Sequence, residues 1–181
     1  SERIFRILWD NMIIKHRLPT RRKSLNDQYI EFEWGSIIEG KSAEHPEGLI
    51  GAGCDLVIMD EASKMNLKRI WQSYIRPTLS DKKGKAIFIS TPSGYDYFWE
   101  LFNLAKTRKD WFSFSSPSWE NTYAFPKGRE EEDLEEAAST LSQEAFSQEY
   151  GAAFTSMSGR VYADFDREKN VGYYPYIPLY P

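Results

Sequence analysis

The spacing of apolar residues at the start of the chain predicts a helix followed by a β-hairpin. Apolar side chains recur at helical intervals through residues 2–16, which is typical of an amphipathic helix. Residues 29–34 alternate apolar and acidic side chains, which indicates a half-exposed antiparallel strand. Gly35-Ser36 then separates this strand from a second strand-like run, so we expect a hairpin with a two-residue Gly-Ser loop.

The next part of the chain has the pattern of a strand–helix–strand unit. Two short apolar runs, residues 56–59 and 86–89, are the expected strands. Between them, apolar residues within 67–75 fall at helical spacing, and Pro77 is expected to end that helix. Strands joined by a helical crossover should be parallel, with a right-handed connection, so the sequence predicts an α/β fold with a parallel sheet.

Beyond this unit the pattern becomes mainly helical. Helices are predicted over 98–105, 129–141 and 142–154, and residues 111–115 have the composition of one more strand. The acidic run that opens the second of these helices suits a helix N-terminus and a solvated helix face. Residues 156–181 are rich in Tyr, Gly and Pro, which predicts a connector.

Composition and charge narrow the class of protein. The chain of 181 residues is 41% hydrophobic and 15% aromatic, which indicates a globular protein with a sizeable core. Its net charge of -4 argues against DNA binding through bulk positive charge, so any DNA contact should be local or supplied by other subunits. The single cysteine, Cys54, suits a reducing compartment. Because the only histidines are His16 and His45, the chain has too few Cys and His residues for a zinc cluster to be expected. No apolar run of the sequence is long enough to span a membrane.

Residues 35–42 match the phosphate-loop pattern G-x-x-x-x-G-K-[ST], with Lys41 at the lysine position. A phosphate loop follows a buried parallel strand and opens a helix whose N–H groups receive the phosphates. Here the preceding strand has an antiparallel pattern, and Pro46 and three closely spaced glycines occupy the place of that helix. We therefore interpret the match as accidental and assign no phosphate-binding role to Lys41.

A basic cluster follows the first predicted helix, in a segment that is expected to be a loop. Such a cluster is either a solvated loop or a contact to DNA phosphates, and the solvated loop is the favoured interpretation. The members of this basic cluster are Arg17, Arg21, Arg22 and Lys23.

Polar residues follow directly after each of the two predicted parallel strands. Asp60-Glu61 comes after the first strand, and Ser90-Thr91-Pro92 comes after the second. Because the carboxyl ends of parallel strands meet at one edge of a sheet, both groups should face one crevice. An Asp at this place holds Mg²⁺, usually through water, and a following Glu can deprotonate the water that attacks a γ-phosphate. The alternative is that the acidic pair caps a helix, because Asp is a good N-cap and a helix is predicted from near Ala62. The presence of the second group after the neighbouring strand favours the catalytic interpretation of the first.

Five segments carry a resemblance to a known family. They read "IEFEWGSIIEGKS", "EGLIGAGCDLVIMDEAS", "KAIFISTPSG", "WENTYAFP" and "FSQEYGAAF". Together they resemble the large terminase subunits of tailed bacteriophages, the motors that package DNA into capsids. The resemblance covers nearly the whole chain, and the second and third segments are its most specific parts.

The resemblance implies a fold, an activity and a set of partners. The fold would be part of a P-loop ATPase domain of the ASCE or RecA-like type, with a parallel sheet core and a helical linker region. Asp60 would be the Walker B aspartate that holds Mg²⁺, Glu61 the catalytic carboxylate, and Ser90-Thr91-Pro92 the segment that couples ATP hydrolysis to movement. The intact protein would hydrolyse ATP in a homo-oligomeric ring around double-stranded DNA. It would dock on a portal protein and work with a small terminase subunit in the host cytoplasm.

The resemblance also implies how the chain is divided. Residues 1–126 would be the C-terminal part of an ATPase domain, 127–155 a helical linker subdomain, and 156–181 a connector toward a nuclease domain. In the family, the phosphate loop lies upstream of the helix that opens this chain. The sequence is therefore expected to be an internal piece of a longer protein and to lack ATPase activity by itself.

Two features depart from the family pattern. Many relatives have an arginine, proposed to reach the nucleotide of a neighbouring subunit, where this chain has Ile50. Arg69 and Arg76 are the candidates to replace it. Asp164 and Asp166 are placed like nuclease metal ligands, but alternate acids more often lie on an exposed strand face, and no nuclease role is assigned to them.

Two other functions remain open at this point. A DNA-dependent ATPase of the helicase type shares the Asp-Glu and Ser-Thr-Pro pair, but it would continue into a second RecA-like lobe. A non-catalytic module that has kept the fold and lost nucleotide binding would explain the missing phosphate loop. The sequence upstream of Ser1 would distinguish these alternatives.

Overall fold

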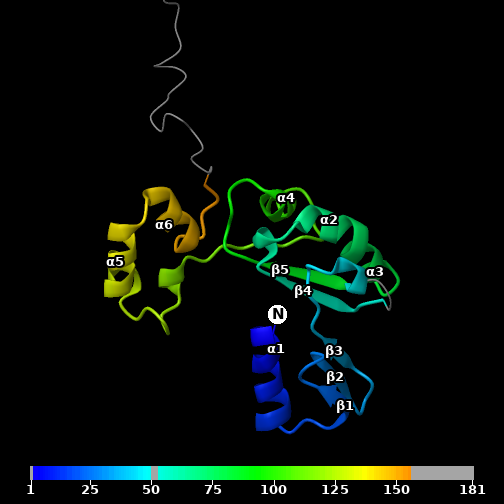
Figure 1. The fold of residues 1–181 in the computed structure, drawn as a ribbon. Coiled ribbons are helices and arrows are strands. Elements are labelled where there is room, and N and C mark those ends of the chain that lie inside the picture. Colours follow the sequence, from blue (N-terminus) through cyan, green and yellow to red (C-terminus); the bar gives the residue numbers. More distant parts are fainter. Residues whose placement is uncertain (1, 50–52, 156–181) are drawn as a thin grey trace, which may run out of the picture. The chain divides into compact units, whose positions relative to one another are not determined.

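Residues 2–49 and 53–155 are described by a computed structural model, which has an α/β fold with a parallel pair of strands (Figure 1). The chain divides into two units, which we call unit 1, residues 1–91, and unit 2, residues 92–181. Within the described ranges, no helix has both the length and the apolar composition needed to cross a membrane. The division into ATPase, linker and connector segments that the resemblance implies stays a prediction.

Unit 1 begins with the predicted helix, followed by an antiparallel sheet. α1 (Glu2–Trp9) continues into the π-helical segment η1 (Asp10–Lys15), which confirms the first prediction. The sheet has the order β1-β2-β3, with β1 (Thr20–Ser24), β2 (Tyr29–Phe32) and β3 (Ile37–Glu39). The strand β1 contains three of the four residues of the basic cluster, so the expectation of a loop there is wrong. As an edge strand with mostly exposed side chains, β1 needs few apolar residues and has no apolar pattern to reveal it.

The helix packs on one face of this sheet. Phe5 and Ile13 of the helix form a buried core with Ile30 and Phe32 of β2. Ile30 and Phe32 are alternate residues of a strand and therefore point to the same face. The amphipathic helix that the sequence predicts thus packs Phe5 and Ile13 against this sheet.

β2 and β3 form the predicted hairpin, but its loop is longer than expected. The N–H of Phe32 donates to the carbonyl of Ser36 at 2.9 Å, and the N–H of Gly35 donates to the carbonyl of Phe32 at 2.9 Å. The loop therefore comprises Glu33, Trp34 and Gly35, and Gly35 has a φ of 88°. Glycine adopts this left-handed conformation without strain, which explains its place at the end of a three-residue loop.

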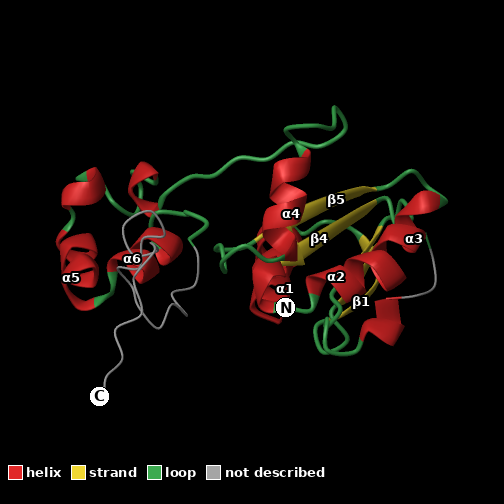
Figure 2. Cartoon of the chain, turned by 90° about the horizontal axis from the view of Figure 1, so that it is seen from above, coloured by secondary structure: helices red, strands yellow, loops and turns green. Residues whose placement is uncertain are grey.

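The predicted strand–helix–strand unit follows and is confirmed. β4 (Leu56–Asp60) and β5 (Lys85–Ile89) are parallel, and the last residues of the two strands lie opposite each other. Figures 1 and 2 show the two strands side by side. Two short 3-10 segments, η2 (Pro46–Leu49) and η3 (Ala62–Lys64), lie before and after β4.

The crossover between the strands is one helical segment that is longer than predicted. It comprises α2 (Leu67–Ile70), the π-helical η4 (Trp71–Ile75) and α3 (Arg76–Ser80). The expectation that Pro77 ends the helix is therefore wrong. The bonding pattern changes where η4 meets α3, and Pro77 lies in the first turn of α3, where the missing proline N–H is tolerated.

The two faces of the β4–β5 pair differ. On one face, the ring of Phe88 makes an edge contact with Trp71 of η4, with ring centroids 5.0 Å apart, and Met59 is buried. The other face carries four large apolar side chains that are about half exposed: Leu56, Ile58, Ile87 and Ile89. Parallel sheets in α/β proteins are normally covered on both faces, so this face has the composition of a surface that other residues cover.

Unit 2 contains the predicted helices. α4 (Tyr97–Leu104), α5 (Glu132–Thr140) and α6 (Gln143–Glu149) lie within the predicted ranges, except that α4 starts one residue earlier. Two 3-10 segments, η5 (Ser118–Glu120) and η6 (Gly128–Glu130), lie between α4 and α5. The buried apolar residues of these helices are Phe98, Leu101, Leu134 and Phe146.

Residues 111–115 do not form the predicted strand. Phe112 and Phe114 are alternate residues with exposed rings, 85% and 76%, so the side chains alternate as a strand requires. No neighbouring strand pairs with this segment among the described residues. A strand exists only as part of a ladder of backbone hydrogen bonds, so the composition alone could not produce one.

Candidate functional site

The predicted acidic pair lies at the carboxyl end of the parallel strand β4. Asp60 is the last residue of β4, and Glu61 follows it before η3 begins. Both side chains are exposed. The backbone of Glu61 is left-handed, with φ 52° and ψ 40°, a conformation that is uncommon for a residue other than glycine and that often marks functional positions.

The second predicted group lies directly beside the first. Asp60 is opposite Ile89 in the parallel ladder, so Ser90 is the residue that continues β5 next to the acidic pair. The backbone N–H of Ser63 donates a hydrogen bond to Oγ of Ser90 at 3.1 Å. This bond joins the turn that contains Glu61 to the end of the neighbouring strand. Asp60, Glu61 and Ser90 therefore lie at one edge of the sheet, and the expectation that both groups face one crevice stays a prediction.

The same bond bears on the helix-cap alternative. An N-cap side chain accepts a hydrogen bond from the backbone N–H two or three residues later. The N–H three residues after Asp60 belongs to Ser63, and it donates to Ser90. Glu61, which precedes η3, makes no capping bond with its side chain. The Ser63 N–H is therefore bound to Ser90 and not to Asp60, and Glu61 does not cap η3.

Thr91 and Pro92 continue the predicted coupling segment across the boundary of the two units. Thr91 is the last residue of unit 1 and Pro92 the first of unit 2. Four residues later, Oδ1 of Asp96 accepts a hydrogen bond from the N–H of Trp99 at 3.0 Å and caps α4. The segment therefore connects the edge of the parallel sheet directly to a capped helix.

The phosphate-loop octet lies elsewhere in unit 1. Gly35 closes the β2–β3 loop, and β3 within the octet is the third strand of the antiparallel sheet. Lys41 follows β3 and forms an exposed ion pair with Glu39 at 2.6 Å. The next helical element is the four-residue η2, which starts five residues after Lys41. The octet thus has neither the parallel strand nor the helix that a phosphate loop needs.

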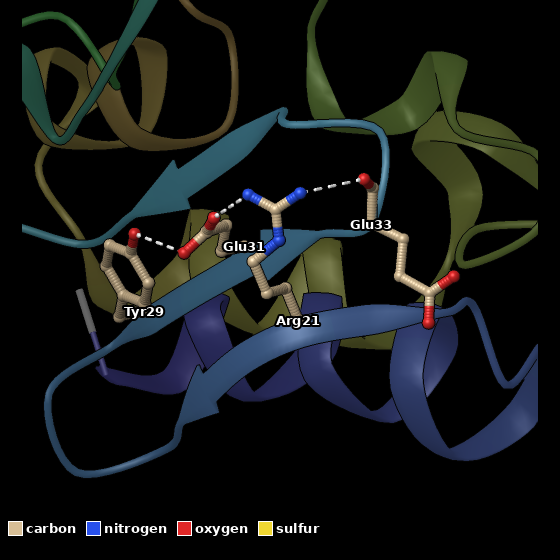
Figure 3. A network of polar contacts seen from close by, with 4 residues as sticks. All are labelled: Arg21, Tyr29, Glu31 and Glu33. Atoms are coloured by element: carbon tan, nitrogen blue, oxygen red, sulfur yellow. Dashed lines mark hydrogen bonds and ion pairs between the residues drawn. The ribbon is translucent and has the colours of Figure 1, made fainter.

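Two residues of the basic cluster, Arg21 and Arg22, have partners close by. Nη1 of Arg21 binds Oε1 of Glu31 at 3.1 Å, and the guanidinium of Arg22 lies 5.3 Å from the ring centre of Tyr29 (Figure 3 shows Arg21, Tyr29 and Glu31). These contacts lie on the sheet face opposite the buried core, where acids balance the basic side chains. They favour a solvated surface over a DNA contact.

The two candidates for a trans-acting arginine also contact residues of their own helical segment. Nη2 of Arg69 donates to the phenol oxygen of Tyr74 at 3.3 Å, and Nη1 of Arg76 donates to Oγ of Ser80 at 2.8 Å. Both arginines are exposed. The predictions made for Ile50, Asp164, Asp166 and the 156–181 connector fall outside the described residues.

One contact of the candidate site had no signal in the sequence. The Ser63 contribution to the site is its backbone N–H, which every residue except proline has. The left-handed backbone of Glu61 had no signal either. Left-handed positions are usually predicted from a glycine in the sequence, and residue 61 is a glutamate. Both features depend on how the β4 strand ends, and only the structure shows that.

Comparison with known proteins gives a family for the chain. Residues 10–169 match the family model described as "Terminase large subunit, T4likevirus-type, N-terminal". The large terminase subunit of Escherichia phage T5 is 32% identical over 159 residues, and the match covers 86% of this chain and 35% of that protein. The large terminase subunit of Thermus phage G20c is 36% identical over 146 residues, covering 72% of this chain and 29% of that protein. The chain thus spans about a third of the length of these relatives.

Solved structures agree with the sequence comparison. The ATPase domain of the large terminase of Thermus phage P74-26 superposes with a TM-score of 0.65 at 26% identity, covering 86% of this chain and 74% of that domain. A variant of the same domain, with one arginine replaced by alanine, gives a TM-score of 0.66 at 27% identity. The family model covers most of the chain, and the fold agrees with it. The chain therefore belongs to the large terminase subunit family, of which it represents a fragment.

Proposed function

We propose that the chain is part of the ATP-driven motor that packages double-stranded DNA in a bacteriophage. It would be the C-terminal part of a P-loop ATPase domain of the ASCE or RecA-like type and carry the acids for ATP hydrolysis. The observation that carries the proposal is the placement of Asp60 and Glu61 at the carboxyl end of β4. The backbone N–H of Ser63 joins the turn after β4 to Ser90, which directly follows the neighbouring strand β5. Ligands in open α/β sheets bind at this edge.

The acidic pair fits a magnesium–nucleotide complex. Mg²⁺ in such sites is held by one or two carboxylates together with phosphate oxygens and water, and not by a full set of protein ligands. Two adjacent exposed carboxylates meet that need, and no cluster of three or more His, Cys, Asp or Glu suited to a metal occurs in residues 2–49 and 53–155. Asp60 would hold the ion, which when bound would neutralise charge on the phosphates.

Glu61 would act on the attacking water. A carboxylate that follows the metal-binding Asp can accept a hydrogen bond from water, orient it and remove its proton. Its exposed side chain is accessible to solvent, and its strained backbone is held in place by the bond between Ser63 and Ser90. Ser90 would thus position the turn, while Thr91 and Pro92 would pass a change at this edge along the chain toward α4.

Membership of the family supports the partners in the proposal. The intact protein would form a homo-oligomeric ring around double-stranded DNA in the host cytoplasm, docked on a portal protein and assisted by a small terminase subunit. It would also carry the phosphate loop and a metal-dependent nuclease in segments beyond this chain. Asp164 and Asp166 are not proposed as nuclease ligands.

The test is the change Glu61→Gln in the intact motor protein. The amide has nearly the same size, and Asp60 is unchanged, so ATP binding should persist. Hydrolysis should fall by roughly 10²–10⁴-fold, the usual contribution of a general base, or about 3–5 kcal/mol of barrier. Glu47→Gln, at an exposed acid on η2 of the same unit, is the control and should hydrolyse ATP at the normal rate. Normal hydrolysis by Glu61→Gln would contradict the catalytic role and favour a non-catalytic module.

A further inference from the structure

The side chain of Gln148 on α6 joins two segments that are distant in sequence. Its Oε1 accepts a hydrogen bond from the backbone N–H of Gly94 at 3.3 Å and another from Oγ1 of Thr155 at 3.4 Å. Gly94 lies three residues after Thr91, in the loop that leads from the coupling segment to α4. Thr155 lies in the segment that follows α6. One amide oxygen thus holds the loop after the coupling segment next to the chain that leaves α6.

Aromatic packing fixes the same two parts of unit 2. The ring of Phe154 contacts Phe98 and Phe102 of α4, with centroid distances of 5.9 and 5.1 Å. The N–H of Ala153 donates to the carbonyl of Ser147 at 3.0 Å, which keeps this segment against α6. The segment after α6 is therefore bound on one side to α4 and on the other to α6.

The loop that contains Gly94 is held at two points. Asp96 caps α4 at one end, and the Gly94 N–H is bound to Gln148 in the middle. Gly94 is buried and has a φ of 69°, so the loop turns here in a way that a side chain would oppose. Thr91 and Gly94 are separated by two residues, and the N–H of Gly94 is bound to the side chain of Gln148.

We propose that Gln148 is a positioning residue that transmits movement of the coupling segment to the chain following residue 155. The inference rests on the proposed function, and it assigns a role in DNA movement, not in ATP hydrolysis, to a side chain of α6. Both bonding partners are donors, so the essential atom is the acceptor oxygen. A glutamate at position 148 has an acceptor oxygen at the same place, so it should preserve both hydrogen bonds. A methionine of similar size lacks that oxygen and should lose them.

The experiment uses the intact motor protein with three variants, and it measures ATP turnover and the length of DNA packaged per ATP. In Gln148→Met, ATP turnover should stay within about twofold, while packaged DNA per ATP should fall about fivefold or more, the factor expected for one lost hydrogen bond. Hydrogen exchange at the Gly94 amide should become faster in this variant. Gln148→Glu should behave like the wild type in all three measurements. Gln143→Met, at an exposed glutamine of the same helix, is the matched control and should change none of them.

Three results would overturn the inference. In the first, Gln148→Met packages the normal length of DNA per ATP. In the second, ATP turnover falls as much as packaging does. In the third, Gln148→Glu is as defective as Gln148→Met. The last two would assign Gln148 to general stability or to hydrolysis. Failure of the proposed function would appear separately, as normal hydrolysis in Glu61→Gln.

Discussion

The backbone N–H of Ser63 and the hydroxyl of Ser90 form a 3.1 Å hydrogen bond that joins the turn after β4 to the end of β5. The two residues are 27 positions apart, and the whole crossover helix lies between them. Parallel pairing of the strands brings the two ends together, and this bond then fixes the turn in which Glu61 stands. The first prediction follows from it.

Ser90→Ala removes the hydroxyl that accepts this bond, so the half-buried N–H of Ser63 loses that acceptor. We expect a loss of about 1 kcal/mol of unfolding free energy, the usual value of one hydrogen bond. ATP hydrolysis by the intact protein should fall about tenfold or more, because the carboxylate of Glu61 is then held less accurately. Ser90→Thr retains a hydroxyl and should restore both values, and Ser73→Ala, at an exposed serine of η4, should change neither. Urea denaturation and a steady-state ATPase assay measure the two effects.

Thr91→Ala should separate hydrolysis from movement. The hydroxyl of Thr91 lies one residue beyond Ser90, where we expect it to sense the γ-phosphate. Its loss should leave at least part of the ATP turnover, while the length of DNA packaged per ATP falls about fivefold, as for one lost hydrogen bond. Both quantities are measured in parallel on the intact motor. Equal loss of turnover and packaging would place Thr91 in the hydrolysis step instead.

Lys41→Ala should have almost no effect on nucleotide use. Lys41 forms an exposed ion pair with Glu39, and such pairs contribute about 0–1 kcal/mol to stability. Because the octet that contains Lys41 lies on an antiparallel sheet, ATP affinity and turnover of the intact protein should stay within about twofold. Nucleotide titration and an ATPase assay check this. If the isolated chain hydrolysed ATP and Lys41→Ala abolished that activity, the octet would be a phosphate loop after all.

The Tyr29 phenol should titrate at higher pH than an ordinary tyrosine. Partial burial and the charge of Glu31, to which the phenol donates a hydrogen bond at 3.4 Å, raise the pKa of Tyr29 above its ordinary value of 10.0 (Figure 3). A raised pKa in the folded protein means that the protonated phenol stabilises the fold. This stability is fully present below pH 10 and is lost as the pH rises through the folded-state pKa.

Glu31→Gln tests this interpretation. The change removes the negative charge, so the pKa of Tyr29 should fall part of the way toward 10.0, and burial should keep it above that value. Glu33→Gln is the control, since its carboxylate points away from the phenol (Figure 3). The measurement is an NMR titration of the protein with labelled tyrosine ring carbons. An unchanged Tyr29 pKa in Glu31→Gln would show that the carboxylate does not act on the phenol.

The sequence was sufficient to predict the core of the parallel unit. Four-residue apolar runs with turn residues on either side indicated β4 and β5, and their parallel pairing placed Asp60 and Ser90 at one edge of the sheet. This worked because burial of one strand face by a helix requires apolar residues in the sequence. The chemistry proposed for the site rests on the residues that stand directly after each run.

The predictions that failed depended on partners that the sequence does not show. The backbone of β1 pairs with β2, although its basic and polar side chains have no strand pattern. Residues 111–115 have a strand composition, but no described strand pairs with them. The helix continues past Pro77 because the change from π- to α-helical bonding accommodates the proline. For β1 and for residues 111–115 the pairing of strands decides the outcome, and for Pro77 the local bonding pattern of the helix decides it.

The left-handed backbone of Glu61 has a consequence for engineering this protein. A residue with a side chain at φ 52° costs roughly 1–2 kcal/mol relative to glycine, so Glu61→Gly should raise the melting temperature by a few degrees. The same change removes the proposed general base and should abolish ATP turnover. A search for heat-resistant variants by thermal selection alone would therefore enrich inactive proteins at this position. The most stable sequence and the most active sequence of this protein should differ at residue 61.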